Sequence, residues 1–296
     1  MLSTRENPPS SSAEWAVLIW RGPFPWRHVD LLGQHEFRSF SLWLVVSNLV
    51  GSAIVYGDRA LLVRIFGLSE IPFYNVPLEL LGRLMIVVNS AVTVIFPAMS
   101  RAAENKRVFG DVYVTLTTFL SVVIGFVLLL VSIFTPWGLQ VWLGNDFRDH
   151  STGIVRILLI GLAFQSLNVF ALASLNARGF ARPITFMHLI ETPVYFWALY
   201  RCGLDLGLTG VALVWSGRLI LEYACFAGFQ AFVGGKEGRL MRAVGALIAA
   251  CNVIPMAMLA VAGNQRLALT TSGLLAALSV AWGSSLLRKE YMYATK

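Results

Sequence analysis

The chain has 296 residues, of which 57% are hydrophobic and 13% charged, and its mean hydropathy is +0.69. A soluble domain usually carries about 25% charged residues, so this composition excludes an ordinary soluble protein. The net charge of +7 has the sign that suits nucleic acid, but a nucleic-acid-binding protein gathers its basic residues on one soluble module. Here they are spread between apolar stretches, and we therefore expect no nucleic-acid partner.

Eight apolar stretches of roughly 20 residues or more follow one another along the chain, which is the length that a helix needs to cross the hydrocarbon core of a bilayer. The sequence therefore predicts an all-α integral membrane protein with about eight transmembrane helices. We expect a cytoplasmic N-terminal segment at 1–38, a membrane domain at 39–290 and a cytoplasmic tail at 291–296. The predicted spans are 40–66, 72–99, 111–135, 153–175, 183–202, 206–233, 240–262 and 267–287.

The basic residues follow a regular alternation along these spans. Fourteen of the 23 lysines and arginines lie on one side of the predicted membrane domain, before the first span and after the second, fourth, sixth and eighth, whereas three lie on the opposite side. Cytoplasmic loops carry such an excess of lysine and arginine. We therefore expect a multi-pass protein of the inner (plasma) membrane with both termini in the cytoplasm.

The sequence lacks the common motifs of catalysis and metal binding. It has no GxxxxGK[ST] phosphate loop and no GxSxG nucleophile elbow, and its four histidines show no metal-ligand spacing. The three cysteines, Cys202, Cys225 and Cys251, lie in or at the ends of spans without a CxxC pair, which is typical of small apolar packing residues. We expect no enzyme activity, no catalytic residue, no bound metal and no cofactor.

Charged side chains inside the predicted spans are the strongest functional signal. A charge at the bilayer centre costs about 2.5–3.5 kcal/mol on the insertion scale, so such residues usually face a bundle interior or a wet cavity. Glu79 and Arg83 are four residues apart and share one helix face, as do Arg218 and Glu222. We expect a candidate substrate-binding cavity lined by Asp58, Arg59, Glu79, Arg83, Glu191, Arg218 and Glu222.

The depth of the charged residues in the first two predicted spans indicates which of them lie close together. Asp58 lies eight residues before the predicted end of the first span, and Glu79 lies seven residues after the start of the second. At 1.5 Å per residue both lie roughly 10–12 Å inside the outer boundary. We therefore predict an ion pair of Asp58 or Arg59 with Glu79 or Arg83, with the charges facing the interior. Two interpretations stay open: a structural ion pair that locks two helices together, and a polar wall that faces a water-filled path.

Five segments carry a family resemblance. Residues 47–85 read SNLVGSAIVYGDRALLVRIFGLSEIPFYNVPLELLGRLM, with an aspartate–arginine pair late in one span and a glycine and an aromatic residue just before the next. The segments VIFPAMSRAAENKR (94–107), VWLGNDF (141–147), LNARGFARPITFMHLIE (175–191) and GLTGVALVWSGRLILE (207–222) follow. In order and spacing these segments resemble the O-antigen type of polysaccharide flippase, within the multidrug/oligosaccharidyl-lipid/polysaccharide exporter superfamily. Residues 47–85 resemble its seventh and eighth helices, and the resemblance covers about residues 38–290.

The resemblance implies both a fold and a function. Such flippases have twelve or fourteen helices in two six-helix lobes around a central cavity, and this chain is similar to the C-terminal lobe plus two further helices. The implied function is transport of a polyprenyl-diphosphate-linked oligosaccharide across the inner membrane in surface polysaccharide biosynthesis, by alternating access. Because arginine binds phosphate through a planar fork, we expect Arg59, Arg83 and Arg218 to contact the diphosphate.

The N-terminal lobe of such flippases has no counterpart in this chain. We interpret the chain as a fragment of a longer transporter, in which residues 1–38 resemble the segment between the lobes; assembly of two chains is the alternative. The expected partners are the lipid-linked oligosaccharide, the lipid bilayer, and a missing N-terminal lobe or other polysaccharide assembly proteins. The sequence does not define the sugar, the coupling ion or the oligomeric state.

Two other functions stay open. A cation-coupled exporter of small molecules from the same superfamily would carry fewer arginines and more acidic groups in its cavity. A membrane enzyme that processes polyprenyl-linked glycans usually carries a sizeable outer loop, whereas the longest outer loop expected here, at 136–152, is short. We therefore place transport of a lipid-linked oligosaccharide first.

Overall fold

The computed structural model describes residues 31–102 and 106–262, and these residues lie in long α-helices or in the short turns between them. The helices are α2 (Leu31–Glu70), α3 (Pro72–Ala102), α4 (Lys106–Leu143), α5 (Asn145–Ala177) and α6 (Ala181–Ala262). The expected all-α fold therefore holds over the described part of the chain. Most of the predicted N-terminal segment 1–38, the predicted span 267–287 and the predicted tail 291–296 lie outside the described residues.

A glycine kinks α2 near its end, and a proline begins α3. Gly67 has a φ of 73°, a conformation that glycine adopts at little cost because it has no Cβ. The carbonyl of Ile71 then accepts hydrogen bonds from the backbone N–H groups of Tyr74 and Asn75. Pro72 suits the first position of a helix, where no N–H partner is needed. The break expected between residues 66 and 72 is therefore present.

The outer loop expected at 136–152 is wrong. Helix α4 continues to Leu143 and α5 begins at Asn145, so that only Gly144, with a φ of 94°, separates them. The polar residues after Gly144 remain helical because they bond within their own helix. The hydroxyl of Thr152, for example, donates to the carbonyl of Arg148 over 2.5 Å. Polarity alone therefore indicated a loop where the chain forms a helix.

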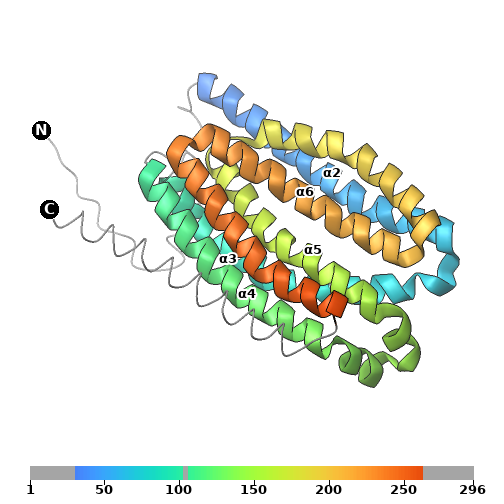
Figure 1. Ribbon diagram of the computed structural model, residues 1–296. Coiled ribbons are helices and arrows are strands. Elements are labelled where there is room, and N and C mark those ends of the chain that lie inside the picture. Colours follow the sequence, from blue (N-terminus) through green and yellow to red (C-terminus); the bar gives the residue numbers. More distant parts are fainter. Residues whose placement is uncertain (1–30, 103–105, 263–296) are drawn as a thin grey trace, which may run out of the picture.

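Helix α6 folds back on itself at Gly207, whose φ is 64°. A straight helix over Ala181–Gly234 would be about 80 Å long, far more than the bilayer core of about 30 Å. In Figure 1 the yellow part of α6 before Gly207 and the orange part after it instead run side by side in opposite directions. We call residues 181–206 the first leg and residues 208–234 the second leg.

Four stretches within the described residues are long and apolar enough to cross a membrane: Pro72–Val94, Tyr113–Leu143, Asn145–Ala177 and Ala181–Gly234. The predicted second, third and fourth spans each overlap one of them, and the predicted fifth and sixth spans together correspond to the two legs of α6. The predicted first span lies in α2, which is not one of the four. The expected count of eight is therefore not confirmed.

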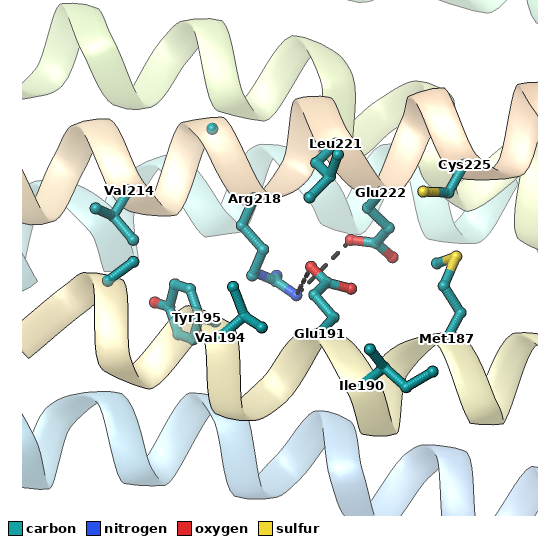
Figure 2. A pocket seen from close by; sticks show the side chains of 12 residues that line it. Met187, Ile190, Glu191, Val194, Tyr195, Val214, Arg218, Leu221, Glu222 and Cys225 are labelled. Atoms are coloured by element: carbon teal, nitrogen blue, oxygen red, sulfur yellow. Dashed lines mark ion pairs between the residues drawn. The ribbon is translucent and has the colours of Figure 1, made fainter.

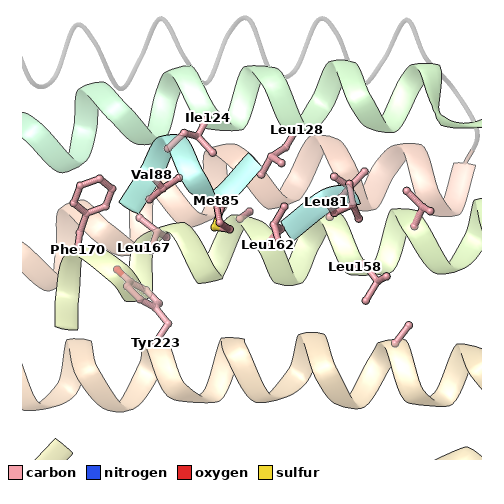
Figure 3. Close-up of a cluster of buried hydrophobic side chains, with 14 of the residues drawn as sticks. Leu81, Met85, Val88, Ile124, Leu128, Leu158, Leu162, Leu167, Phe170 and Tyr223 are labelled. Carbon is pink, nitrogen blue, oxygen red and sulfur yellow. The ribbon is translucent and has the colours of Figure 1, made fainter. Parts of the chain in front are cut away.

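Helix α5 is the central helix of the fold. Figure 3 shows its leucines, among them Leu158, Leu162 and Leu167, in one buried cluster with residues of α3 and α4. On another side α5 approaches the second leg closely at Gly161, where an added Cβ would lie 2.9 Å from the Cα of Ser216. Small residues permit such approaches between membrane helices. This packing holds the second leg in place and sets the position of its charged residues.

Candidate functional site

Asp58 and Arg59 are neighbours in α2 but belong to different surroundings. Asp58 is buried and accepts a hydrogen bond of 2.9 Å from the hydroxyl of Tyr195, on the first leg of α6. Arg59 points to the outside of the bundle and forms an ion pair with Glu79, its Nη2 lying 2.9 Å from Oε1. Successive residues of a helix are rotated by about 100°. Asp58 and Arg59, although adjacent in the sequence, therefore belong to two different sites.

The first site is a set of buried charges between the two legs of α6. Nη1 of Arg218 lies 3.5 Å from Oε1 of Glu191 and 3.7 Å from Oε2 of Glu222. The imidazole of His188 lies between the same two carboxyl groups, with Nδ1 3.6 Å from Glu191 and Nε2 4.0 Å from Glu222. Figure 2 shows Arg218, Glu191 and Glu222 converging from the facing legs. None of these four side chains is exposed by more than 15%.

Tyr195 connects this set to α2. The Cζ atom of Arg218 lies 5.3 Å from the centroid of the Tyr195 ring, within the range of a cation–π contact, and the hydroxyl of the same tyrosine bonds to Asp58. The contacts thus continue from α2 through the first leg to the second leg. We call the connected residues the buried charge cluster: Asp58, His188, Glu191, Tyr195, Arg218 and Glu222.

A cavity of about 430 Å³ opens beside the buried charge cluster. Glu191, Arg218 and Glu222 provide its charged part, and apolar side chains of both legs form the rest of the wall (Figure 2). These apolar residues include Met187, Ile190, Val194, Val214 and Leu221. The three charged groups therefore face a partly enclosed space with few other polar neighbours.

The second site is a polar face on α2 and α3. Arg83 follows Glu79 by one helical turn; its side chain is exposed, and it has no ion-pair partner in the part of the chain that the structure describes. Further exposed polar residues continue along the same two helices. We call this face the polar wall: Asn48, Ser52, Tyr56 and Arg59 on α2, and Glu79, Arg83, Asn89, Ser90 and Thr93 on α3.

The predicted ion pairs are present, but Asp58 has a partner on another helix than the predicted one. The ion pair between the first two spans is confirmed and joins Arg59 to Glu79, whereas Asp58 pairs with Tyr195 rather than with α3. The side chains of Arg59 and Glu79 are 45% and 55% exposed, so this pair does not lie in the interior of the chain. The helical pair of Arg218 and Glu222 is confirmed, and Glu191 joins it.

The seven residues predicted for one cavity therefore fall into two groups. Arg59, Glu79 and Arg83 belong to the polar wall, and the other four belong to the buried charge cluster. The sequence analysis missed Tyr195, although it follows Glu191 by four residues and so lies on the same helix face. Among the described residues, no group of three or more histidine, cysteine, aspartate or glutamate side chains is arranged to hold a metal ion.

Long apolar helices with charges enclosed between them define a multi-pass membrane protein. Residues 10–152 match the family model described as "Polysaccharide biosynthesis protein". This match includes Asp58, Arg59, Glu79 and Arg83 and ends before the two legs of α6. No solved structure matches the chain.

A curated relative gives the same indication. The "Putative O-antigen transporter" of Shigella flexneri is 28% identical to this chain over 183 residues, which are 62% of this chain and 44% of the relative. The matched part thus spans less than half of that relative's length. Together the two matches support a protein of the polysaccharide flippase type, and the resemblance inferred from the sequence motifs is confirmed.

Proposed function

We propose that this chain forms part of a flippase that moves a polyprenyl-diphosphate-linked oligosaccharide across the inner membrane, from the inner to the outer leaflet. Two matches support the general class: the polysaccharide biosynthesis family and the O-antigen transporter. The observation that carries the proposal is Arg83, an exposed arginine without an ion-pair partner in the described residues, halfway along an apolar helix.

The depth of Arg83 disfavours a lipid-facing position. It lies eleven residues after Pro72, in a span that ends at Val94, so it is about 16 Å from either end. A charge at that depth usually faces a bundle interior or a water-filled cavity. The neighbouring residues of the polar wall are also hydrophilic. We infer that the polar wall lines a water-filled path or faces a further part of the transporter.

The chemistry of the polar wall suits a diphosphate that carries sugars. The guanidinium of Arg83 can donate two parallel hydrogen bonds to a phosphate, and no carboxylate of the described residues competes for it. Arg59 is held by Glu79 and can exchange this partner for phosphate. Asn48 and Asn89 can bond to sugar hydroxyls. In this proposal Arg59 and Arg83 bind the diphosphate first, because Arg218 is already flanked by two carboxyl groups.

A second lobe completes the proposed transporter. The polar wall is exposed along α2 and α3, and a facing lobe would enclose it as a central cavity. Rocking of the two lobes would then open the cavity to each side of the membrane in turn. Residues 1–38 would connect the lobes in the cytoplasm, and both termini of this chain would lie there. We propose transport rather than catalysis, in keeping with the name of the relative.

One observation favours the cation-coupled exporter that the sequence left open. The buried charge cluster contains more carboxyl groups than basic groups, as an exporter driven by cations would require. The polar wall favours the flippase, because its Arg59 and Arg83 suit an anionic head group. Substrate binding to these arginines therefore distinguishes the two functions.

Binding of polyprenyl diphosphate to the purified full chain in lipid nanodiscs tests the proposal. We expect saturable binding that Arg83→Ala weakens about tenfold or more, equivalent to about 1.4 kcal/mol, and that Arg83→Lys weakens less, because lysine keeps the charge but loses the fork. Arg64→Ala is the matched control, since Arg64 is also exposed but lies nearer the end of α2. Equal binding by wild type and Arg83→Ala, or equal binding of the uncharged polyprenol, would overturn the proposal.

A further inference from the structure

The buried charge cluster contains more acidic than basic groups. Its three carboxyl groups, on Asp58, Glu191 and Glu222, face one guanidinium, on Arg218, so three negative charges against one positive leave an excess of two. A protonated His188 would reduce this excess to one. Arg59 does not help, because Glu79 already neutralises it. An uncompensated charge enclosed between apolar helices is strongly unfavourable.

Among the described residues, the other groups that face the cluster add no positive charge. Tyr74 from α3 is fully buried, and Tyr195 from the first leg bonds to Asp58; both carry uncharged phenols. Cys225 from the second leg lines the same cavity as Glu191 and Glu222, and a thiol is neutral or negative. At least one carboxyl group must therefore be neutralised by something else.

Glu191 is a buried carboxyl group whose basic partners are shared with Glu222. Its side chain is 10% exposed, and neither of its oxygens has a hydrogen-bond partner. Its nearest cations, Arg218 at 3.5 Å and His188 at 3.6 Å, are also shared with Glu222. The group lines the cavity between the legs, as Figure 2 shows. A buried carboxylate in these surroundings requires a ligand that it can bind.

The geometry favours a proton over a metal cation as this ligand. A metal ion needs several ligands converging on one point, and the described residues contain no such group. A proton needs one carboxyl oxygen and a path to water. The cavity of about 430 Å³ beside Glu191 and Glu222 has room for the water molecules that such a path needs. His188 lies between the two carboxyl groups and can pass a proton from one to the other.

We propose that Glu191 and Glu222, together with Arg218 and His188, form a proton-binding site that holds one exchangeable proton between the two legs of α6. Arg218 neutralises one of the two carboxylates, and the proton neutralises the other. Loss of this proton places a second negative charge between the legs and pushes the carboxyl groups apart. The site goes beyond substrate transport and does not depend on which substrate the chain binds.

Infrared spectroscopy of the purified full chain in lipid nanodiscs tests the proposal, with the proton itself as the probe. The carbonyl stretch of a protonated carboxylic acid is distinct from that of a carboxylate. All 16 aspartates and glutamates of the chain contribute to this band at low pH, so the proton of the site is the part that remains above the pH at which exposed carboxyl groups lose theirs. We expect wild type to show this remaining band and to lose it in a separate transition at higher pH. Glu191→Gln and Glu222→Gln should each remove or shift that transition. Glu79→Gln is the matched control, because Glu79 is an exposed carboxylate on the polar wall.

The possible outcomes distinguish a proton held at this site from a proton held on Asp58, the other buried acid. They also distinguish loss of the proton from failure of a variant to fold. The wild-type titration alone is decisive if a variant does not fold, because loss of the whole band together with that of the exposed carboxyl groups would overturn the proposal. A band that persists unchanged in both Glu191→Gln and Glu222→Gln but disappears in Asp58→Asn would also overturn it, since the proton would then reside on α2. Binding of polyprenyl diphosphate is measured separately, so either proposal can fail without the other.

Discussion

Tyr195 donates a hydrogen bond to Asp58 across 2.9 Å, and the two residues are 3% and 6% exposed. The bond joins α2 to the first leg of α6. Next to it, Gly57 leaves room for the ring of Phe196, whose Cζ would lie 2.7 Å from an added Cβ. The aspartate of the aspartate–arginine pair therefore holds two helices together, while the adjacent arginine faces the polar wall.

We expect Tyr195→Phe to destabilise the chain, because Asp58 would lose the hydrogen bond to one oxygen while its other oxygen already has none. Hydrogen bonds between membrane helices contribute about 0.6 kcal/mol on average and up to about 1.7. Thermal unfolding in detergent measures the change. Tyr200→Phe, at an exposed position of the same leg, should leave the midpoint unchanged. Equal midpoints for wild type and Tyr195→Phe would show that the bond contributes nothing.

The sequence predicted those features that depend on neighbouring residues. Apolar length indicated helices, Gly67 and Pro72 indicated a break, and the spacing of Arg218 and Glu222 indicated a pair on one helix face. The sequence did not predict contacts between residues that are far apart in the chain. Asp58 and Tyr195 are 137 positions apart, and a pattern of period 3.6 holds no information about which helix lies opposite. Glu79 likewise had two arginines within reach, and only the packing of α2 on α3 selects Arg59.

We expect Gly161→Ala to destabilise the chain by about 1–3 kcal/mol, the usual cost of overpacking. The added methyl group would lie 2.7 Å from the Ser216 hydroxyl oxygen and 2.9 Å from its Cα, so the second leg would have to move. Gly153→Ala is the control on the same helix, because nothing lies within 4 Å of its added Cβ; it should be neutral or stabilising, since alanine favours helix. Equal unfolding midpoints for the two variants would contradict the close approach.

Exchanging the charges of Arg59 and Glu79 tests their ion pair. Arg59→Glu places two like charges at a distance of a few ångströms and should lower the amount of folded protein in the membrane, as should Glu79→Arg. The double exchange restores opposite charges and should recover most of that amount. The gain should be modest, about 1 kcal/mol or less, because both side chains are about half exposed. Immunoblotting of membranes measures the amounts; a double variant no better than the single ones would refute the pair.

Single cysteines at the start of α5 and at the start of α6, which follows the end of α5 closely, test the orientation of the chain. Helix α5 has 33 residues and is about 50 Å long, so Asn145 and Arg182 should lie near opposite membrane surfaces. With the native cysteines replaced, we expect Asn145→Cys to react with an impermeant maleimide in intact cells. Arg182→Cys should react only after the membrane is opened. Labelling of Arg182→Cys in intact cells would reverse the orientation predicted from the basic residues.

Arg218 gives the sharpest test of how the buried charge cluster is balanced. Arg218→Ala removes its one permanent positive charge and leaves Glu191 and Glu222 facing each other across the legs, with only His188 between them. Breaking a buried ion pair in this way typically costs about 3–5 kcal/mol, so we expect low abundance and a lower unfolding midpoint at neutral pH. Arg218→Ala combined with Glu191→Gln and Glu222→Gln removes the charges together and should recover abundance. Lower pH should partly rescue Arg218→Ala, because protonation neutralises the carboxylates, and should leave the triple variant unchanged. If Arg218→Ala unfolds at the wild-type midpoint at every pH, the cluster does not need its arginine, and the charge balance described for it is wrong.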